Sequence, residues 1–330
     1  MIKKLLKSIS IVSIALTMAF TSYITPALAE EVSEENTVIT IDEYGNEVFK
    51  PLEDFKEDLE EDEEFKKDDI FDNDFKLNSL ENFEVGELAD ISAVLGSDNR
   101  EAITKTTKKP YSAICLIRVI YSDGYKTFAT GWMAKNDVLV TSAHCVYDPK
   151  HKGWIKSIVV TPATHGLDDP YGLTEGYMQA SIPSKFRTIS DSDYKAGKTL
   201  GKNKEIWPYD YAVIRLKEPI GDKCGYLSSS SADKYVEDDY EIELPGYPSV
   251  GKYDYTMYTD YGSVVKYTSS LIYHDIDETD GQSGAPLIVE PKSGSYKVIG
   301  INSGINDSKS NRAVRVTSNL RSMIQDAHDL

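Results

Sequence analysis

One serine, one histidine and one aspartate stand in this sequence in settings that favour nucleophilic catalysis. Ser283 lies within residues 280–286, between Gly281 and Gly284 and shortly before an apolar run. The two glycines permit a tight turn in which successive backbone N–H groups point the same way. Two such groups beside a hydroxyl would form an oxyanion hole. A plain Gly-Ser-Gly turn between strands is the alternative, since turns of that composition are common.

A base and a carboxylate are also present, as a serine nucleophile requires near neutral pH. His144 follows the apolar run 138–140 among small residues, and it can take a proton and return it to a leaving amine. Asp210 opens an apolar strand between two tyrosines, where it would fix the imidazole tautomer. The chain order His, Asp, Ser is that of triad proteases on a double β-barrel. His274 is the rival base, but it lacks the small-residue turn of His144.

Short β-strands must position these side chains. From residue 111 onward, runs rich in Ile, Val, Tyr and Thr are punctuated by Gly, Asn, Asp and Pro. Many short strands with frequent turns indicate an all-β fold, an antiparallel sandwich or barrel. A helix is expected only near the end, over about residues 318–327, with Thr317 or Ser318 as its cap.

The first 29 residues have the features of a secretory signal peptide. Three lysines precede an apolar run over residues 9–20, and small residues fit cleavage after Ala29. A membrane anchor is the alternative, but the apolar run is short and interrupted by Ser and Thr. We therefore expect a secreted, extracellular protein with no membrane contact once the signal is removed.

The acidity of the chain, which has a formal charge of −18, belongs to one segment. Residues 30–90 hold 24 acidic and 5 basic side chains, whereas residues 91–330 are nearly neutral. No basic patch indicates a nucleic-acid partner. Residues 30–92 could be a solvated, disordered tail. The aromatic side chains scattered through them favour a pro-segment that shields or helps to fold the following domain.

Three cysteines, Cys115, Cys145 and Cys224, allow one disulfide at most, and the sequence leaves the pairing open. Their spacing fits no zinc site. The sequence predicts no metal and no cofactor, while a structural calcium ion is left open.

Taken together, these motifs resemble the secreted bacterial serine proteases of the chymotrypsin fold, and within them the glutamyl endopeptidases, the V8-protease-like group. The resemblance covers roughly residues 93–325. The stretches that carry it are 94–100, 130–133, 141–146, 209–214, 218–221, 245–248 and 281–286.

The resemblance implies an all-β protein of two antiparallel six-stranded β-barrels with a C-terminal α-helix. It implies Ser283 as nucleophile, His144 as base, Asp210 as orienting acid, and the N–H groups of Gly281 and Ser283 as oxyanion donors. The mature chain would begin near Ala93 or Val94, which makes the acidic segment a removable propeptide. The expected division is signal peptide 1–29, acidic propeptide 30–92 and protease domain 93–330, with barrels over about 111–205 and 220–316.

Three positions depart from the pattern of this group. Ala129 stands where many members have the cysteine that pairs with the one after the catalytic histidine, so Cys145 lacks its usual partner. Asn302 stands at or next to the pocket histidine of the glutamate-specific members, and asparagine cannot bring a positive charge. Glu278 replaces a threonine, and its carboxylate would repel a substrate carboxylate.

The substrate pocket is therefore expected among residues from three short stretches. They are Val94, Asp277, Glu278, Thr279, Asn302, Ser303 and Gly304. A new N-terminal amine at Ala93 or Val94 could partly replace the missing positive charge.

The sequence predicts a secreted, monomeric serine endopeptidase that hydrolyses proteins and peptides through an acyl-enzyme. Cleavage after Glu or Asp follows from the resemblance, whereas the acids at 277, 278 and 280 favour cleavage after Lys or Arg. A non-catalytic binding protein or toxin of the same fold is a third hypothesis. The complete set of catalytic residue types argues against it.

Overall fold

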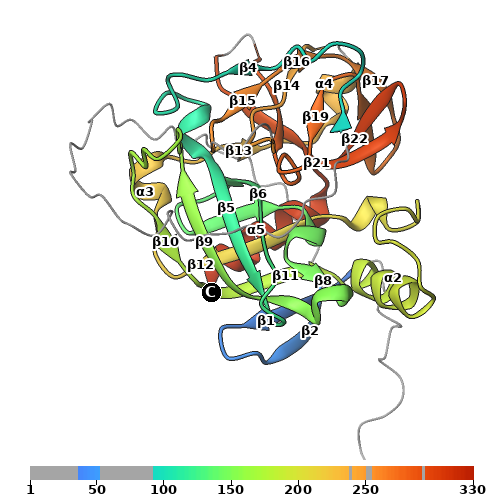
Figure 1. The fold of residues 1–330 in the computed structure, drawn as a ribbon. Coiled ribbons are helices and arrows are strands. Elements are labelled where there is room, and N and C mark those ends of the chain that lie inside the picture. Colours follow the sequence, from blue (N-terminus) through green and yellow to red (C-terminus); the bar gives the residue numbers. More distant parts are fainter. Residues whose placement is uncertain (1–35, 53–91, 238–239, 250–254, 292–293) are drawn as a thin grey trace, which may run out of the picture. The chain divides into compact units, whose positions relative to one another are not determined.

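The computed structural model describes residues 36–52, 92–237, 240–249, 255–291 and 294–330. Within them the chain forms two large antiparallel sheets, few helices and several single-turn 3-10 helices (Figure 1). The predicted signal peptide and most of the acidic segment lie outside the described residues. No described helix is long and apolar enough to cross a membrane.

The first sheet has ten strands among the described residues, in the order β10-β9-β5-β6-β7-β12-β11-β1-β2, with β8 paired to β9. Its members are β1 Thr37–Asp42, β2 Glu47–Pro51, β5 Ile114–Tyr121, β6 Lys126–Met133, β7 Val138–Thr141, β8 Tyr147–Asp148, β9 Gly153–Pro162, β10 Thr174–Glu175, β11 Tyr177–Pro183 and β12 Ala212–Leu216. β12 therefore joins this sheet although it follows the expected limit at residue 205.

The second sheet follows the order β16-β14-β20-β21-β22-β18-β17, and β13 pairs with β21 in parallel. Its members are β13 Ser228–Ser229, β14 Ile242–Glu243, β16 Tyr261–Gly262, β17 Val264–Tyr267, β18 Leu271–His274, β20 Pro286–Val289, β21 Lys297–Asp307 and β22 Ser310–Arg315. Two further ladders are two-stranded: β3 Ser92–Ala93 with β19 Glu278–Thr279, and β4 Glu101–Ala102 with β15 Tyr258–Thr259.

The main apolar core fills the first sheet and also includes residues of the second sheet, such as Leu271 and Ile301. In the first sheet β5 is buried along almost its whole length, and the adjoining strands contribute Trp132, Leu139 and Ile158. A separate cluster in the second sheet contains Leu244 and Leu287. Burial of this apolar surface is the main term that stabilises both sheets.

The α-helices of the described part of the chain are α2 Ser184–Lys195, α3 Gly221–Cys224, α4 Asp233–Glu237 and α5 Ser318–Asp329. The predicted C-terminal helix is confirmed as α5, and the Thr317 hydroxyl caps it by accepting from the N–H of Leu320. The expectation that only the C-terminus is helical was wrong, because α2 adds three turns. α2 is hard to predict since it is polar and docks mainly through Phe186 and Ile189.

Candidate active site

His144 and Asp210 lie in direct contact, as the sequence predicts for a base and its orienting acid. Nδ1 of His144 is 2.8 Å from Oδ2 of Asp210, and the backbone N–H of His144 donates to Oδ1 at 3.0 Å. Both carboxylate oxygens of Asp210 thus bind His144. These contacts fix the orientation of the imidazole ring and favour the tautomer that carries a proton on Nδ1. The imidazole is 29% exposed and the carboxyl only 6%, so the base is in contact with solvent while its orienting acid is buried.

Strand pairing explains why two residues 66 positions apart meet. β7 ends at Thr141, and the 3-10 helix η3 Ala143–Cys145 then carries His144. The 3-10 helix η5 Trp207–Tyr209 delivers Asp210 just before β12. β7 and β12 are antiparallel neighbours with Ala212 opposite Thr141, so the end of one lies beside the start of the other.

Ser303 is a third member of this group that the sequence assigned to the pocket instead. Its hydroxyl donates to Oδ2 of Asp210 at 2.6 Å, from β21 of the second sheet. The carboxylate is therefore satisfied from both sheets while remaining buried. A lone serine in a strand gives no sequence signal for such a contact.

The charges of the pair support proton transfer at the imidazole. Burial of His144 opposes its protonation, but the Asp210 carboxylate outweighs this effect and raises the pKa of the imidazole above its ordinary value. Burial alone would raise the pKa of Asp210, yet His144 and the Ser303 hydroxyl hold it below the ordinary value. Asp210 is thus the ionised partner, which stabilises an imidazolium.

The turn around Ser283 packs against the end of β7. Gly281 and Gly284 have φ angles of +92° and +85°, the left-handed conformation that the sequence requires of them. A Cβ at Gly284 would lie 2.1 Å from Oγ1 of Thr141, so only glycine permits this approach. The backbone N–H of Thr130 donates to the carbonyl of Ser283 at 3.0 Å. Among the described residues no hydrogen bond joins the Ser283 hydroxyl to His144, and in free enzymes such a catalytic hydrogen bond is often long or poorly aligned.

Arg100 supports this turn through hydrogen bonds, and no role for it was predicted from the sequence. Nη1 of Arg100 donates to Oγ1 of Thr279 at 2.7 Å and to Oε1 of Gln282 at 2.8 Å. The N–H of Thr279 donates to the same Gln282 oxygen at 3.1 Å. The Arg100 side chain is only 2% exposed and is balanced by Asp98. Arg100 therefore holds Thr279 and Gln282 together, on either side of Gly281 at the start of the turn.

Asp277 and Glu278 are both buried, but they differ in what they bind. The Asp277 carboxylate accepts the backbone N–H groups of Leu95 at 2.6 Å and Asn99 at 3.1 Å. Glu278 accepts a hydrogen bond from the Asn302 amide, and burial raises the pKa of its carboxyl to about 7. The Asp277 carboxylate is thus fully occupied by backbone N–H groups, whereas the Glu278 carboxyl can gain or lose its proton near neutral pH.

Two further predicted pocket residues, Val94 and Gly304, lie directly after β3 and on β21. Ser92–Ala93 forms the strand β3 next to β19, with Ala93 opposite Glu278, and half-buried Val94 follows it. Gly304 has a φ angle of +118°, and a Cβ there would lie 3.6 Å from the Arg312 guanidinium.

Arg312 is a buried cation that the sequence did not single out. It donates to the carbonyls of Ser303, at 3.0 Å, and Ile305. Its guanidinium also lies over the Trp207 ring, 4.1 Å from the centroid. The positive charge of Arg312 therefore lies against the backbone of β21, the strand that borders the predicted pocket.

His274, the rival base, is not placed for catalysis. It is fully buried on β18, and its ring lies near the Asn302 amide. Burial lowers the pKa of this imidazole to about 4, so the ring is neutral. It lacks the carboxylate contact that His144 has.

The three cysteines are buried free thiols. Among the described residues no group of three or more His, Cys, Asp or Glu side chains is arranged to hold a metal ion.

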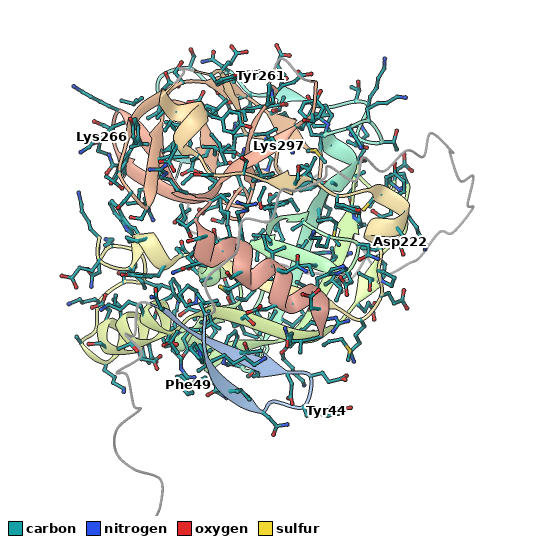
Figure 2. All side chains as sticks on the ribbon, turned by 180° about the vertical axis from the view of Figure 1, so that it is seen from behind. Tyr44, Phe49, Asp222, Tyr261, Lys266 and Lys297 are labelled. Atoms are coloured by element: carbon teal, nitrogen blue, oxygen red, sulfur yellow. The ribbon has the colours of Figure 1, made fainter. Side chains whose placement is uncertain are left out.

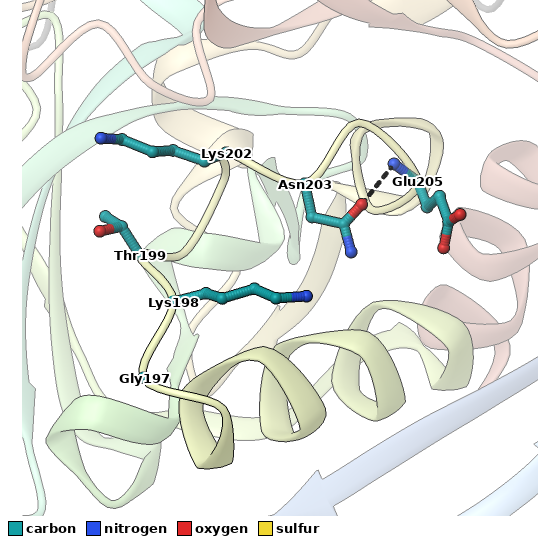
Figure 3. Close-up of a pocket in the computed structure, with 6 residues that line it drawn as sticks. All are labelled: Gly197, Lys198, Thr199, Lys202, Asn203 and Glu205. Carbon is teal, nitrogen blue, oxygen red and sulfur yellow. Dashed lines mark hydrogen bonds between the residues drawn. The ribbon is translucent and has the colours of Figure 1, made fainter.

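A separate hollow lies in the loop that follows α2 (Figure 3). Residues 197–199, 202, 203 and 205 line it. The ammonium of Lys198 is paired with Asp193 at 2.9 Å, and Oδ1 of Asn203 accepts the N–H of Glu205 at 3.1 Å. These contacts stabilise the loop that leads to the 3-10 helix before Asp210.

Two curled antiparallel sheets, with the His–Asp pair on one and the glycine-flanked serine on the other, define a protein of the chymotrypsin-like fold. The family model described as Trypsin matches residues 102–324, and the chain belongs to that family. The fold class expected from the sequence is confirmed. The sheets have more than six strands each because short strands and the β1–β2 hairpin join them.

The similarity to glutamyl endopeptidases is also confirmed. A glutamyl endopeptidase of Bacillus licheniformis is 30% identical over 203 residues, 62% of this chain and 57% of that protein. The match thus spans little more than half of that relative. A Bacillus subtilis protein named extracellular metalloprotease is 26% identical over 235 residues, 71% of this chain and 69% of that protein. A solved structure of a Glu endopeptidase in complex with MPD is 20% identical with a TM-score of 0.57, covering 71% of this chain and 99% of that one.

Proposed function

We propose that the protein is a serine endopeptidase that cleaves peptide bonds through an acyl-enzyme on Ser283. The observation that carries this proposal is the bidentate contact of Asp210 with His144, next to a serine turn that only glycine allows. The membership of the trypsin family and the glutamyl endopeptidase relatives support it.

The proposed reaction begins when Oγ of Ser283 attacks the scissile carbonyl carbon and Nε2 of His144 takes the hydroxyl proton. Asp210 stabilises the resulting imidazolium through Nδ1, while the N–H groups of Gly281 and Ser283 bind the oxyanion. Collapse of the tetrahedral intermediate breaks the C–N bond, and the imidazolium gives its proton to the leaving amine. Water then repeats the sequence on the ester and restores Ser283.

For the residue before the scissile bond, we favour Glu or Asp. Asp277, which would select Lys or Arg if it were free, is only 2% exposed and already binds two backbone N–H groups. Glu278 can be neutral below its raised pKa of about 7, which removes its repulsion of a substrate carboxylate. The buried guanidinium of Arg312 adds a favourable positive potential.

Cleavage after Lys or Arg remains the second candidate because of one observation. Above its pKa, Glu278 is a buried anion that would attract a cationic side chain. The two candidates therefore differ in their dependence on pH.

A peptide library digested at pH 6 and pH 8 would separate them. We expect cuts after Glu and Asp, with the ratio of acidic to basic cut sites falling as the pH rises through 7. Using this ratio cancels the titration of His144, which affects all substrates alike. Cuts exclusively after Lys and Arg at both pH values would exclude the glutamyl assignment.

We further propose that the active form is made by cleavage near Ala93 or Val94, after export and removal of residues 1–29. A new amine at Ala93 would lie next to Glu278 in the β3–β19 ladder and could pair with its carboxylate. N-terminal sequencing of the secreted, active protein tests this step, and a start far from residues 93–94 would refute it.

A further inference from the structure

Part of the acidic segment is built into the first sheet. β1 Thr37–Asp42 pairs antiparallel with β11 through five residues, from Val38 opposite Pro183 to Asp42 opposite Gln179. β2 Glu47–Pro51 folds back on β1, so the two strands form a hairpin at the edge of the sheet (Figure 1). Residues 36–52, called the N-terminal hairpin below, thus continue the sheet that carries His144.

The hairpin also contributes to the apolar core. Ile39 is fully buried, Val38 is 4% exposed and Ile41 8%, and all three belong to the main hydrophobic cluster. Oγ1 of Thr40 lies 2.8 Å from Oγ of Ser181 on β11, where one hydroxyl donates to the other. A segment that only screens charge would have no need for these buried contacts.

The acidic side chains of the hairpin have specific partners. Glu47 accepts from the indole N–H of Trp154 and from the Arg187 guanidinium, both at 2.7 Å. Glu43 forms an ion pair with Lys217 at 2.7 Å. These partners come from β9, from α2 and from the end of β12, so the hairpin joins three separate parts of the protease domain.

The hairpin covers β11, which would otherwise be an edge strand of the described sheet. An uncovered edge exposes a row of unpaired N–H and C=O groups and invites wrong pairing. Its outer face is different: Tyr44 is 82% exposed and Phe49 63%, and both side chains project from the hairpin (Figure 2). The hairpin therefore has one face fitted to this domain and one facing solvent.

We propose that the N-terminal hairpin is a lasting structural part of the active enzyme, kept on β11 by strand addition after the chain is cut before residue 93. The partners named above are on β9, β11 and α2 and directly after β12, and none of them belongs to the Ser283 turn or to the residues expected to line the pocket. The hairpin therefore does not have to leave for substrate to bind. The part of the proposal that concerns cutting rests on the processing proposed above. The active enzyme is then a complex of two chains held without a covalent bond.

The test is the composition of the active protein. The full chain is secreted from a bacterial host, purified by its activity, and weighed by native and by denaturing mass spectrometry. We expect a peptide containing residues 36–52 bound one to one under native conditions and released under denaturing ones. Active enzyme that lacks these residues would overturn the proposal. An active chain that is still intact would keep the hairpin but refute the processing step, so the two failures are distinguishable.

A pair of variants tests the contact itself. Ile39→Asp places a charge in the core, and Val48→Asp makes the same change at a position on β2 that is 49% exposed. We expect Ile39→Asp to lower the melting temperature of the active protein by roughly 5–10 °C and to release the peptide, without changing kcat per active site. Val48→Asp should match the wild type.

If Ile39→Asp is not secreted, Ile39→Ala gives a milder loss of the same contact. Wild-type stability and full retention of the peptide in the Ile39 variants would contradict the proposal.

Discussion

Glu278 is one residue with two roles, one in the stability of the fold and one in the proposed choice of substrate. The sequence alone could not separate them. The sequence placed its carboxylate near the pocket, but only the structure shows that it is buried and bonded to Asn302. Burial raises the pKa of this carboxyl to about 7, compared with 4.5 for an ordinary glutamate. Its charge therefore affects the stability of the fold and, under the function proposed above, the choice of substrate.

The stability prediction for Glu278 has a definite sign. Because its pKa is higher in the folded than in the unfolded protein, its contribution is greatest below pH 4.5 and is lost as the pH rises to about 7. Glu278→Gln removes this titration, so the variant should gain on the order of 3 kcal/mol relative to the wild type over that interval. Urea unfolding of both proteins from pH 4.5 to 8 measures the difference. A difference that stays constant with pH would contradict the assignment.

Arg100 is a residue that acts through the turn rather than on the substrate. Arg100→Met removes the cation that holds Thr279 and Gln282, so the turn that carries the proposed oxyanion donors loses this support. We expect kcat to fall about 10²-fold with little change in KM, as for loss of transition-state stabilisation alone. Arg215→Met is the matched control, because this arginine pairs with Asp137 away from the turn. Equal effects of the two variants would show that Arg100 has only a general structural role.

At the scale of the element, the Ser283 turn depends on how closely it approaches β7. A Cβ at Gly284 would come within 2.1 Å of the Thr141 hydroxyl and 2.3 Å of the Thr130 carbonyl. We expect Gly284→Ala to displace the turn and reduce kcat/KM at least 10²-fold. Gly124→Ala is a sharp control, since Gly124 also has a positive φ, +90°, but faces open space. If both variants kept full activity on a peptide ester, close packing of the turn would not matter.

The elements show what a sequence can predict. The periodic, strongly apolar strands such as β5 and the capped helix α5 were predictable because burial and capping leave a local pattern. α2 was missed because only two of its apolar side chains meet the core. The hairpin β1–β2 was missed because its acids are satisfied by partners more than 100 residues away, Trp154 and Arg187 for Glu47.

At the scale of the whole molecule, the site is assembled from both sheets. The Ser142 hydroxyl, two residues before His144, donates to the Asn302 carbonyl at 2.8 Å. The Thr130 hydroxyl donates to the Gly281 carbonyl at 2.8 Å. The residue types of the site were predictable, since the chemistry needs one of each. The supporting contacts were not, because they join segments that are 93 to 182 positions apart, such as Ser303 with Asp210 and Arg100 with Gln282.

Labelling by a serine-directed fluorophosphonate, followed by peptide mass spectrometry, tests the central claim most directly. We expect one adduct, on Ser283 of the secreted and active protein, because His144 and Asp210 would activate that hydroxyl. The adduct should be absent in Ser283→Ala and form at least 10²-fold more slowly in His144→Ala. A folded Ser283→Ala variant that still cleaves peptides, or a wild-type adduct at another residue, would contradict it.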